Sequence, residues 1–228
     1  MKKIMVLAAC LALLAAGAAQ AATTTTNSFS VDLLSPPAGY TPTIYMLNNT
    51  SAFTATGGGP MVNSSLYGQP LTYLYCLNPE RYLYDKDYDY SAISDSGAIY
   101  GSALPNANKI AYLLWNYGAK ATGDEARGLQ AAIWNLVDSR YTLDSAPSGA
   151  LVTDYYQDFL GYVTSYSAID LIDNFYWITP GETVADITGF AYQAVVAPTP
   201  IPGTVMLFGS GLAGLVGIAR FRRKRSAD

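Results

Sequence analysis

Few side chains of this chain can do chemistry, and Cys76 is the one that most needs an explanation. The 228 residues include no histidine, which excludes Ser-His-Asp and Cys-His catalysis and imidazole-ligated metals. Cys10 falls in an apolar N-terminal segment typical of a cleaved leader, so Cys76 is the only cysteine of the remaining chain. A lone thiol of this kind is an inert buried group, half of an intermolecular disulfide, or a thiol consumed in another bond.

The elements that must position Cys76 can be predicted from periodicity and turn residues. Cys76 lies in a strand-like run, 71–77, which ends at a turn. Another strand is expected at 43–47, and two more at 175–178 and 187–196. Apolar residues at helical spacing predict helices at 108–117, 122–138 and 154–165 between them. The order of strands, a helical middle and strands again predicts an α+β fold.

Helix boundaries have their own signals. Gly118 is expected to end the first helix. Thr122 to Glu125 has the form of a capping box and predicts the start of the second helix, and Thr153 is expected to cap the third. The apolar side of the second helix is formed by Leu129, Ile133, Trp134 and Val137.

Two segments around these elements resemble the thioester domains of bacterial surface adhesins. The first is the strand with Tyr75 and Cys76, and the second is the helix with Gln130, followed four residues later by Trp134. The resemblance covers residues 70–140 and implies that the Cys76 thiol attacks the Gln130 carboxamide, releases ammonia and leaves an internal thioester. Leu129 stands where that family often has Thr.

Such a bond has physical requirements. An amide is a poor electrophile, so enforced proximity must contribute about 7–11 kcal/mol and hydrogen-bond donors must hold the oxyanion. We expect those donors from the backbone of the turn at 76–78, with Tyr75 beside the bond and Trp134 shielding it from water. The ordinary alternative is a surface glutamine and a small core cysteine without any bond between them.

Residues 1–21 form a predicted secretory signal peptide. Lys2 and Lys3 precede an almost wholly apolar run that ends at a small-x-small cleavage site, Ala19 to Ala21. The residues up to Cys10 also resemble a lipoprotein cleavage box, but the apolar run continues past them. We therefore expect export through the Sec pathway.

Residues 198–228 form a predicted membrane-inserting tail. A proline-rich linker, 195–203, is not expected to form a helix or a central strand. An uncharged run, 204–219, follows and predicts a short transmembrane helix, and the basic cluster after it should stay cytoplasmic. The tail resembles a PEP-CTERM sorting signal, which implies an exosortase-type membrane protease as a partner and an exopolysaccharide-producing Gram-negative host. The residues that carry this resemblance are Pro200, Ile201, Pro202, Gly203, Arg222 and Arg223, with Ile201 in the place of the usual Glu.

The body, 22–197, is acidic once the two ends are set aside. It holds six Lys/Arg against sixteen Asp/Glu, a net charge near −10. An acidic body without a basic stripe argues against a nucleic-acid partner. The alternating acids at 85–89 resemble a calcium loop, but they lack its sixth-position Gly and twelfth-position Glu, which favours a solvated acidic turn.

Two functional classes follow. In the first, an exported cell-surface or extracellular-matrix protein uses a Cys76–Gln130 thioester to attach covalently to an amine or hydroxyl on a surface or matrix polymer. In the second, a non-reactive structural protein of the exopolysaccharide matrix has the same fold. No enzyme, cofactor or metal site is predicted, because only scattered carboxylates could supply acid–base chemistry. The protein is expected at the membrane before its tail is processed, and in the cell envelope or outside the cell afterwards.

Overall fold

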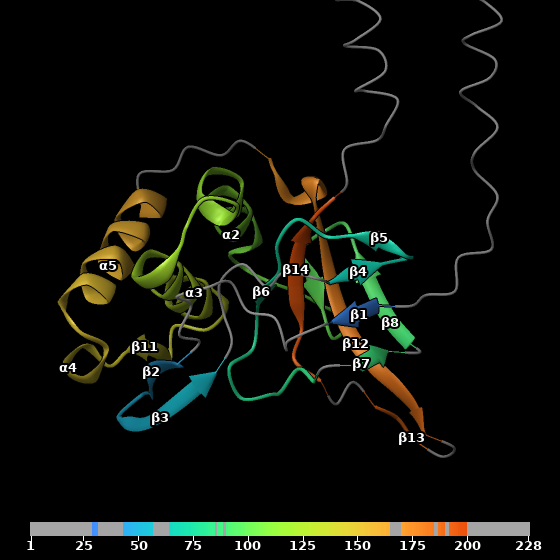
Figure 1. Cartoon of the computed structure of the whole chain (residues 1–228), viewed down its shortest axis with the longest axis horizontal. Coiled ribbons are helices and arrows are strands. Elements are labelled where there is room, and N and C mark those ends of the chain that lie inside the picture. The colour runs from blue at the N-terminus through green and yellow to red at the C-terminus, as the bar shows by residue number, and fades with distance from the viewer. Residues whose placement is uncertain are drawn as a thin grey trace, which may run out of the picture. The chain divides into compact units, whose positions relative to one another are not determined.

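Strands begin and end the described chain and helices fill its middle, so the α+β fold class is correct (Figure 1). The computed structural model describes residues 29–31, 43–56, 64–84, 86–88, 90–164, 170–184, 187–189 and 192–199. All of them belong to one compact unit, Thr26–Thr199. The predicted signal peptide and transmembrane run, and the sorting residues from Pro200 onward, lie outside the described residues.

Four sheets contain the strands of the described residues. The largest has the order β13-β12-β14-β6, and β8 also pairs with the long strand β12. Its strands are β6 (Tyr75–Cys76), β8 (Tyr90–Ser94), β12 (Phe175–Val184), β13 (Ile187–Gly189) and β14 (Val195–Pro198). A second sheet has the order β5-β4-β1-β7, with β1 (Phe29–Val31), β4 (Ser65–Leu66), β5 (Gln69–Pro70) and β7 (Lys86–Tyr88).

The other two sheets are smaller. A three-stranded sheet has the order β11-β2-β3, with β2 (Thr43–Asn48), β3 (Ser51–Thr56) and β11 (Tyr141–Leu143). Its central strand β2 turns Ile44 and Met46 inward, because alternate residues of a strand face opposite sides. A two-stranded hairpin joins β9 (Ala98–Ile99) and β10 (Ser102–Ala103).

The helices pack around α3 (Gly123–Val137), which is buried along most of its length. The remaining helical segments are α2 (Ala107–Leu113), the π-helical turn η1 (Leu114–Gly118), α4 (Ser145–Ser148), α5 (Ala150–Thr164) and the 3-10 turn η2 (Ile172–Asn174). In Figure 1, the helices α2 to α5 and the strands β2, β3 and β11 lie on one side of β6, and β14, β12 and β8 of the largest sheet lie on the other. No helix in this described part of the chain is long and apolar enough to cross a membrane.

Several predicted boundaries differ from the structure. The helix predicted at 108–117 finishes as a π turn that ends at Gly118. The second helix does begin after Thr122, but that side chain makes no capping hydrogen bond. The third helix begins at Ala150, and Thr153 lies inside it, where its hydroxyl donates to the carbonyl of Gly149. A hydroxyl bonded to the preceding turn in this way cannot cap a new helix.

The linker prediction for 195–203 was wrong at its start. Val195–Pro198 is strand β14, which lies between β12 and β6 in the largest sheet. The proline is tolerated because Pro198 is the last residue of the strand, where the missing N–H affects only the final rung of the ladder. The strand predicted at 71–77 is also shorter than expected, since only Tyr75–Cys76 pair with a neighbour.

Candidate functional site

Cys76 lies on the outer edge of the largest sheet. It is paired with Val195 of β14, and the adjacent hydrogen bond runs from the Leu77 N–H to the Ala194 carbonyl. In an antiparallel ladder this pattern marks Cys76 and Val195 as a non-hydrogen-bonded pair. The backbone N–H and C=O of Cys76 therefore point away from β14, and they need partners because the residue is fully buried.

The side chain of Gln130 supplies both partners. The Cys76 N–H donates to Gln130 Oε1 at 2.9 Å, and Gln130 Nε2 donates to the Cys76 carbonyl at 2.7 Å. The carboxamide thus takes the place of a peptide group in a further strand. Gln130 is fully buried, contrary to the ordinary expectation for a helical glutamine. The structure brings together the two residues that the resemblance singled out.

Close packing of α3 against α5 fixes the position of α3 and therefore of Gln130, which α3 carries. A Cβ added to Gly128 would lie 2.6 Å from the Tyr155 Cβ and 3.0 Å from the Tyr156 backbone nitrogen. Glycine is therefore required for this approach. At the start of the same helix, the Arg127 guanidinium donates to the Thr43 carbonyl at 3.1 Å, which ties α3 to β2.

Two tyrosines close to Cys76 in the sequence fix its strand to the helical turn η1. The Tyr73 hydroxyl donates to the Leu114 carbonyl at 3.0 Å, and the Tyr75 hydroxyl donates to the Gly118 carbonyl at 3.1 Å. Both acceptors belong to the π-helical turn η1, and such turns often occur at functional sites. Tyr75 was predicted beside the bond, whereas Tyr73 was missed. The two-residue spacing that puts both rings on one side of a strand was the available signal.

Trp134 lies one helical turn after Gln130 and is fully buried. This position agrees with its predicted place on the same helix face as Gln130. Its indole N–H has no hydrogen-bond partner among the described residues, although buried indole donors usually have one.

Tyr100 is a further neighbour that sequence reasoning did not find. Its hydroxyl donates to the Tyr192 carbonyl at 2.7 Å and accepts from the Ala194 N–H at 2.9 Å, so it fixes the chain just before β14. Burial raises the pKa of the Tyr100 hydroxyl, although the hydrogen bond from the Ala194 N–H and the charge of Arg81 act to lower it. The Arg81 guanidinium lies 4.8 Å from the centre of the Tyr100 ring. No local pattern marks Tyr100, because the backbone groups that its hydroxyl bonds, in Tyr192 and Ala194, are more than 90 residues away.

The arrangement has a definite chemical capability. If the Cys76 sulfur attacks the side-chain carbonyl carbon of Gln130, negative charge develops on Oε1, which already accepts from the Cys76 N–H. The expected donor from the turn at 76–78 is thus the backbone of Cys76 itself. Within the described segments, no three acidic, Cys or His side chains gather as a metal site would require.

Comparison with solved structures gives a structural neighbour, whereas the two other comparisons give none. No protein-family model matches the chain, and no curated protein matches it. The chain is similar to the N-terminal thioester domain of a protein F2-like fibronectin-binding protein from Streptococcus pneumoniae, with a TM-score of 0.39 and 10% sequence identity. The alignment covers 78% of this chain and 96% of that one.

Proposed function

We propose that this chain is an exported surface or extracellular-matrix protein whose body forms an internal thioester between Cys76 and Gln130. The observation that carries the proposal is the double hydrogen bond between the Gln130 carboxamide and the Cys76 backbone, inside a fully buried site. It holds the amide in one orientation beside the residue that bears the thiol. Proximity of this kind is the main contribution that a protein can make to such a reaction.

The reaction balances without a co-reactant. The bond from Cys76 Sγ to the Gln130 carbonyl carbon forms, the bond from that carbon to Nε2 breaks, and the thiol proton leaves with Nε2 as ammonia. The thioester then acylates an amine or hydroxyl of a target, and the Cys76 thiol is regenerated. The body would in this way become covalently joined to a surface or to a matrix polymer.

The C-terminal residues complete the proposal. Pro200, Ile201, Pro202 and Gly203, with Arg222 and Arg223, would direct the exported chain to an exosortase-type protease at the membrane. Cleavage would release the body to the envelope or the matrix. Lasting attachment would then depend on the thioester rather than on the tail.

Intact-mass spectrometry of the full chain tests the thioester. Loss of ammonia lowers the mass by about 17 Da relative to the sequence, and methylamine then adds about 31 Da. The Cys76→Ala variant should show neither change. Alkylation under native conditions is a poor substitute, because Cys76 is fully buried even as a free thiol. The same spectrum shows whether the residues after Gly203 are still present.

A non-reactive structural protein of the matrix is the second candidate. The observation that favours it is that the same two hydrogen bonds are sufficient to satisfy the edge of β6, so Gln130 has a structural role without any reaction. A wild-type chain at full sequence mass that takes up no methylamine would reject the first candidate and favour this one.

A further inference from the structure

A group of tyrosines beside the Cys76 strand presents exposed aromatic rings to solvent. Tyr82 is 67% exposed and Tyr84 is 55% exposed, although large aromatic side chains are normally covered. Their ring centres lie 6.5 Å apart with the planes tilted by 44°. We call Tyr82, Tyr84 and the partly buried Tyr192 the tyrosine shelf.

The shelf is anchored in the core. The Tyr84 ring lies 5.9 Å from Tyr192, Tyr192 lies 5.0 Å from the buried Tyr88, and Tyr88 stacks on Phe29 at 5.7 Å. The Tyr88 hydroxyl also accepts from the Tyr84 N–H at 2.7 Å and donates to the Tyr84 carbonyl at 3.0 Å. Because the buried rings hold the exposed rings in place, the exposed rings lose little conformational freedom when a ligand stacks on them.

The shelf is tied directly to the chain around Cys76. The Gln193 N–H donates to the Tyr82 carbonyl at 3.1 Å, and the Gln193 side chain donates to the Asn78 carbonyl at 2.6 Å. The next residue, Ala194, accepts from the Leu77 N–H at 2.7 Å. One short segment, 192–194, therefore contacts both the shelf and the strand end that follows Cys76.

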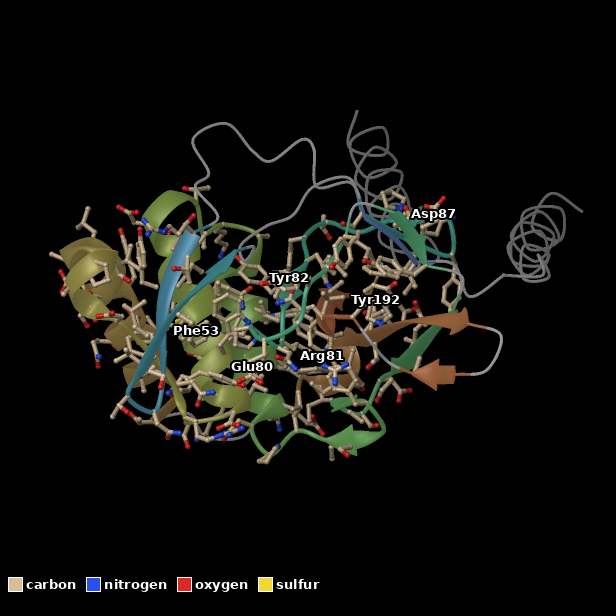
Figure 2. The ribbon with its side chains drawn as sticks, turned by 90° about the horizontal axis from the view of Figure 1, so that it is seen from below. Phe53, Glu80, Arg81, Tyr82, Asp87 and Tyr192 are labelled. Atoms are coloured by element: carbon tan, nitrogen blue, oxygen red, sulfur yellow. The ribbon has the colours of Figure 1, made fainter. Side chains whose placement is uncertain are left out.

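The charges near the shelf restrict what can bind there. Glu80 and Arg81 directly precede Tyr82 and contribute one charge of each sign (Figure 2). The body as a whole carries a net charge near −10, which repels an acidic polymer. The alternating acids at 85–89, which directly follow Tyr84, add to this repulsion. Pyranose rings fit this surface, because their C–H faces stack on aromatic rings while their hydroxyls bond to mixed polar neighbours.

We propose that the tyrosine shelf is a binding subsite for a neutral polysaccharide, which it holds beside the Cys76–Gln130 site. This inference rests on the proposed function only for the covalent step. In that step a sugar hydroxyl oxygen attacks the thioester carbonyl carbon, the bond from that carbon to Cys76 Sγ breaks, and the hydroxyl proton passes to the sulfur. The products are an ester and the Cys76 thiol.

Affinity electrophoresis of the full chain tests the subsite. Native gels would contain hydroxyethyl cellulose, galactomannan or dextran as neutral polymers, and alginate as an acidic one. All chains carry Cys76→Ser, so that only non-covalent binding is measured. We expect at least one neutral polymer to retard the chain, and Tyr82→Ala with Tyr84→Ala to weaken that binding about tenfold or more. Trp115→Ala is the matched control, because Trp115 is 59% exposed and lies in η1.

The outcomes separate the two proposals. The subsite is overturned if no neutral polymer retards the chain, if alginate alone does, or if the Trp115 variant loses binding equally. It is also overturned if immobilised gelatin, a polypeptide, captures the chain through these tyrosines while the neutral polymers do not. Thermal unfolding checks that the variants fold, and Tyr82→Ala alone removes the most exposed ring if the double variant does not. Whether the thioester forms is measured separately, by the loss of ammonia in the intact mass of a chain that retains Cys76.

Discussion

The Gln130 carboxamide pairs with both backbone groups of Cys76, so one contact completes a sheet edge and also prepares a reaction. These roles separate once ammonia leaves. The oxygen can keep its bond to the Cys76 N–H, but the nitrogen that donated to the Cys76 carbonyl is lost. A buried carbonyl without its donor costs free energy of the order of 1 kcal/mol or more. The thioester state therefore lacks a hydrogen bond that the unreacted state has.

Replacing Gln130 by Ala in a Cys76→Ala chain should lower the free energy of unfolding by about 2–4 kcal/mol, because both backbone groups of residue 76 lose their partner in a buried site. Urea unfolding of the two chains gives the difference. Gln157→Ala is the matched control, since Gln157 is exposed on α5 and its loss should change stability by no more than about 0.5 kcal/mol. Equal effects of the two substitutions would refute the structural role of Gln130.

Trp134→Ala should shorten the lifetime of the thioester, because removal of a fully buried ring one turn from Gln130 admits water. Trp134→Phe should keep the bond shielded, and it also removes a buried N–H that has no acceptor in the described chain. The measurement is the rate at which the ammonia-deficient mass gains one water at constant pH. Trp115→Ala, at an exposed position, should leave the rate unchanged. A wild-type rate in Trp134→Ala would show that this ring is not the barrier.

The sequence was informative where short-range patterns decide the structure. The helix that carries Gln130 begins after Thr122, as its boundary signal predicted, and Trp134 lies on the expected side. The contact between Cys76 and Gln130 was reached by resemblance, because no local pattern links residues 54 positions apart. Strand β14 was misjudged for the same reason, since its place between β12 and β6 is fixed by partners that are distant in the sequence.

Gly128→Ala should destabilise the body by about 1–3 kcal/mol, because the added methyl group would overlap α5 at the Tyr155 Cβ and the Tyr156 backbone. Any shift of α3 would also move Gln130 away from Cys76, so we expect less of the ammonia-deficient form. Gly161→Ala is the matched control, because a Cβ there meets nothing within 4 Å. Gly161 lies in an interior turn of α5, so replacing it by alanine should instead raise the free energy of unfolding by about 0.5–1 kcal/mol. Thermal unfolding and intact mass measure both effects, and loss of stability in the Gly161 variant alone would contradict the packing argument.

The buried hydroxyl of Tyr73 should contribute to the loss of stability at high pH. Burial raises the pKa of its hydroxyl, which also donates to the Leu114 carbonyl, so the folded state holds this proton more tightly than the unfolded chain does. The resulting stabilisation is complete below the unfolded value of about 10 and is lost as the pH rises from there toward the higher folded value. Urea unfolding from pH 8 to 11, in a Cys76→Ala chain that cannot undergo thioester hydrolysis, should therefore show a shallower alkaline decline for Tyr73→Phe. Tyr82→Phe, which changes an exposed ring, should decline in parallel with its parent chain. Parallel decline of Tyr73→Phe as well would mean that the Tyr73 proton does not contribute to alkaline unfolding.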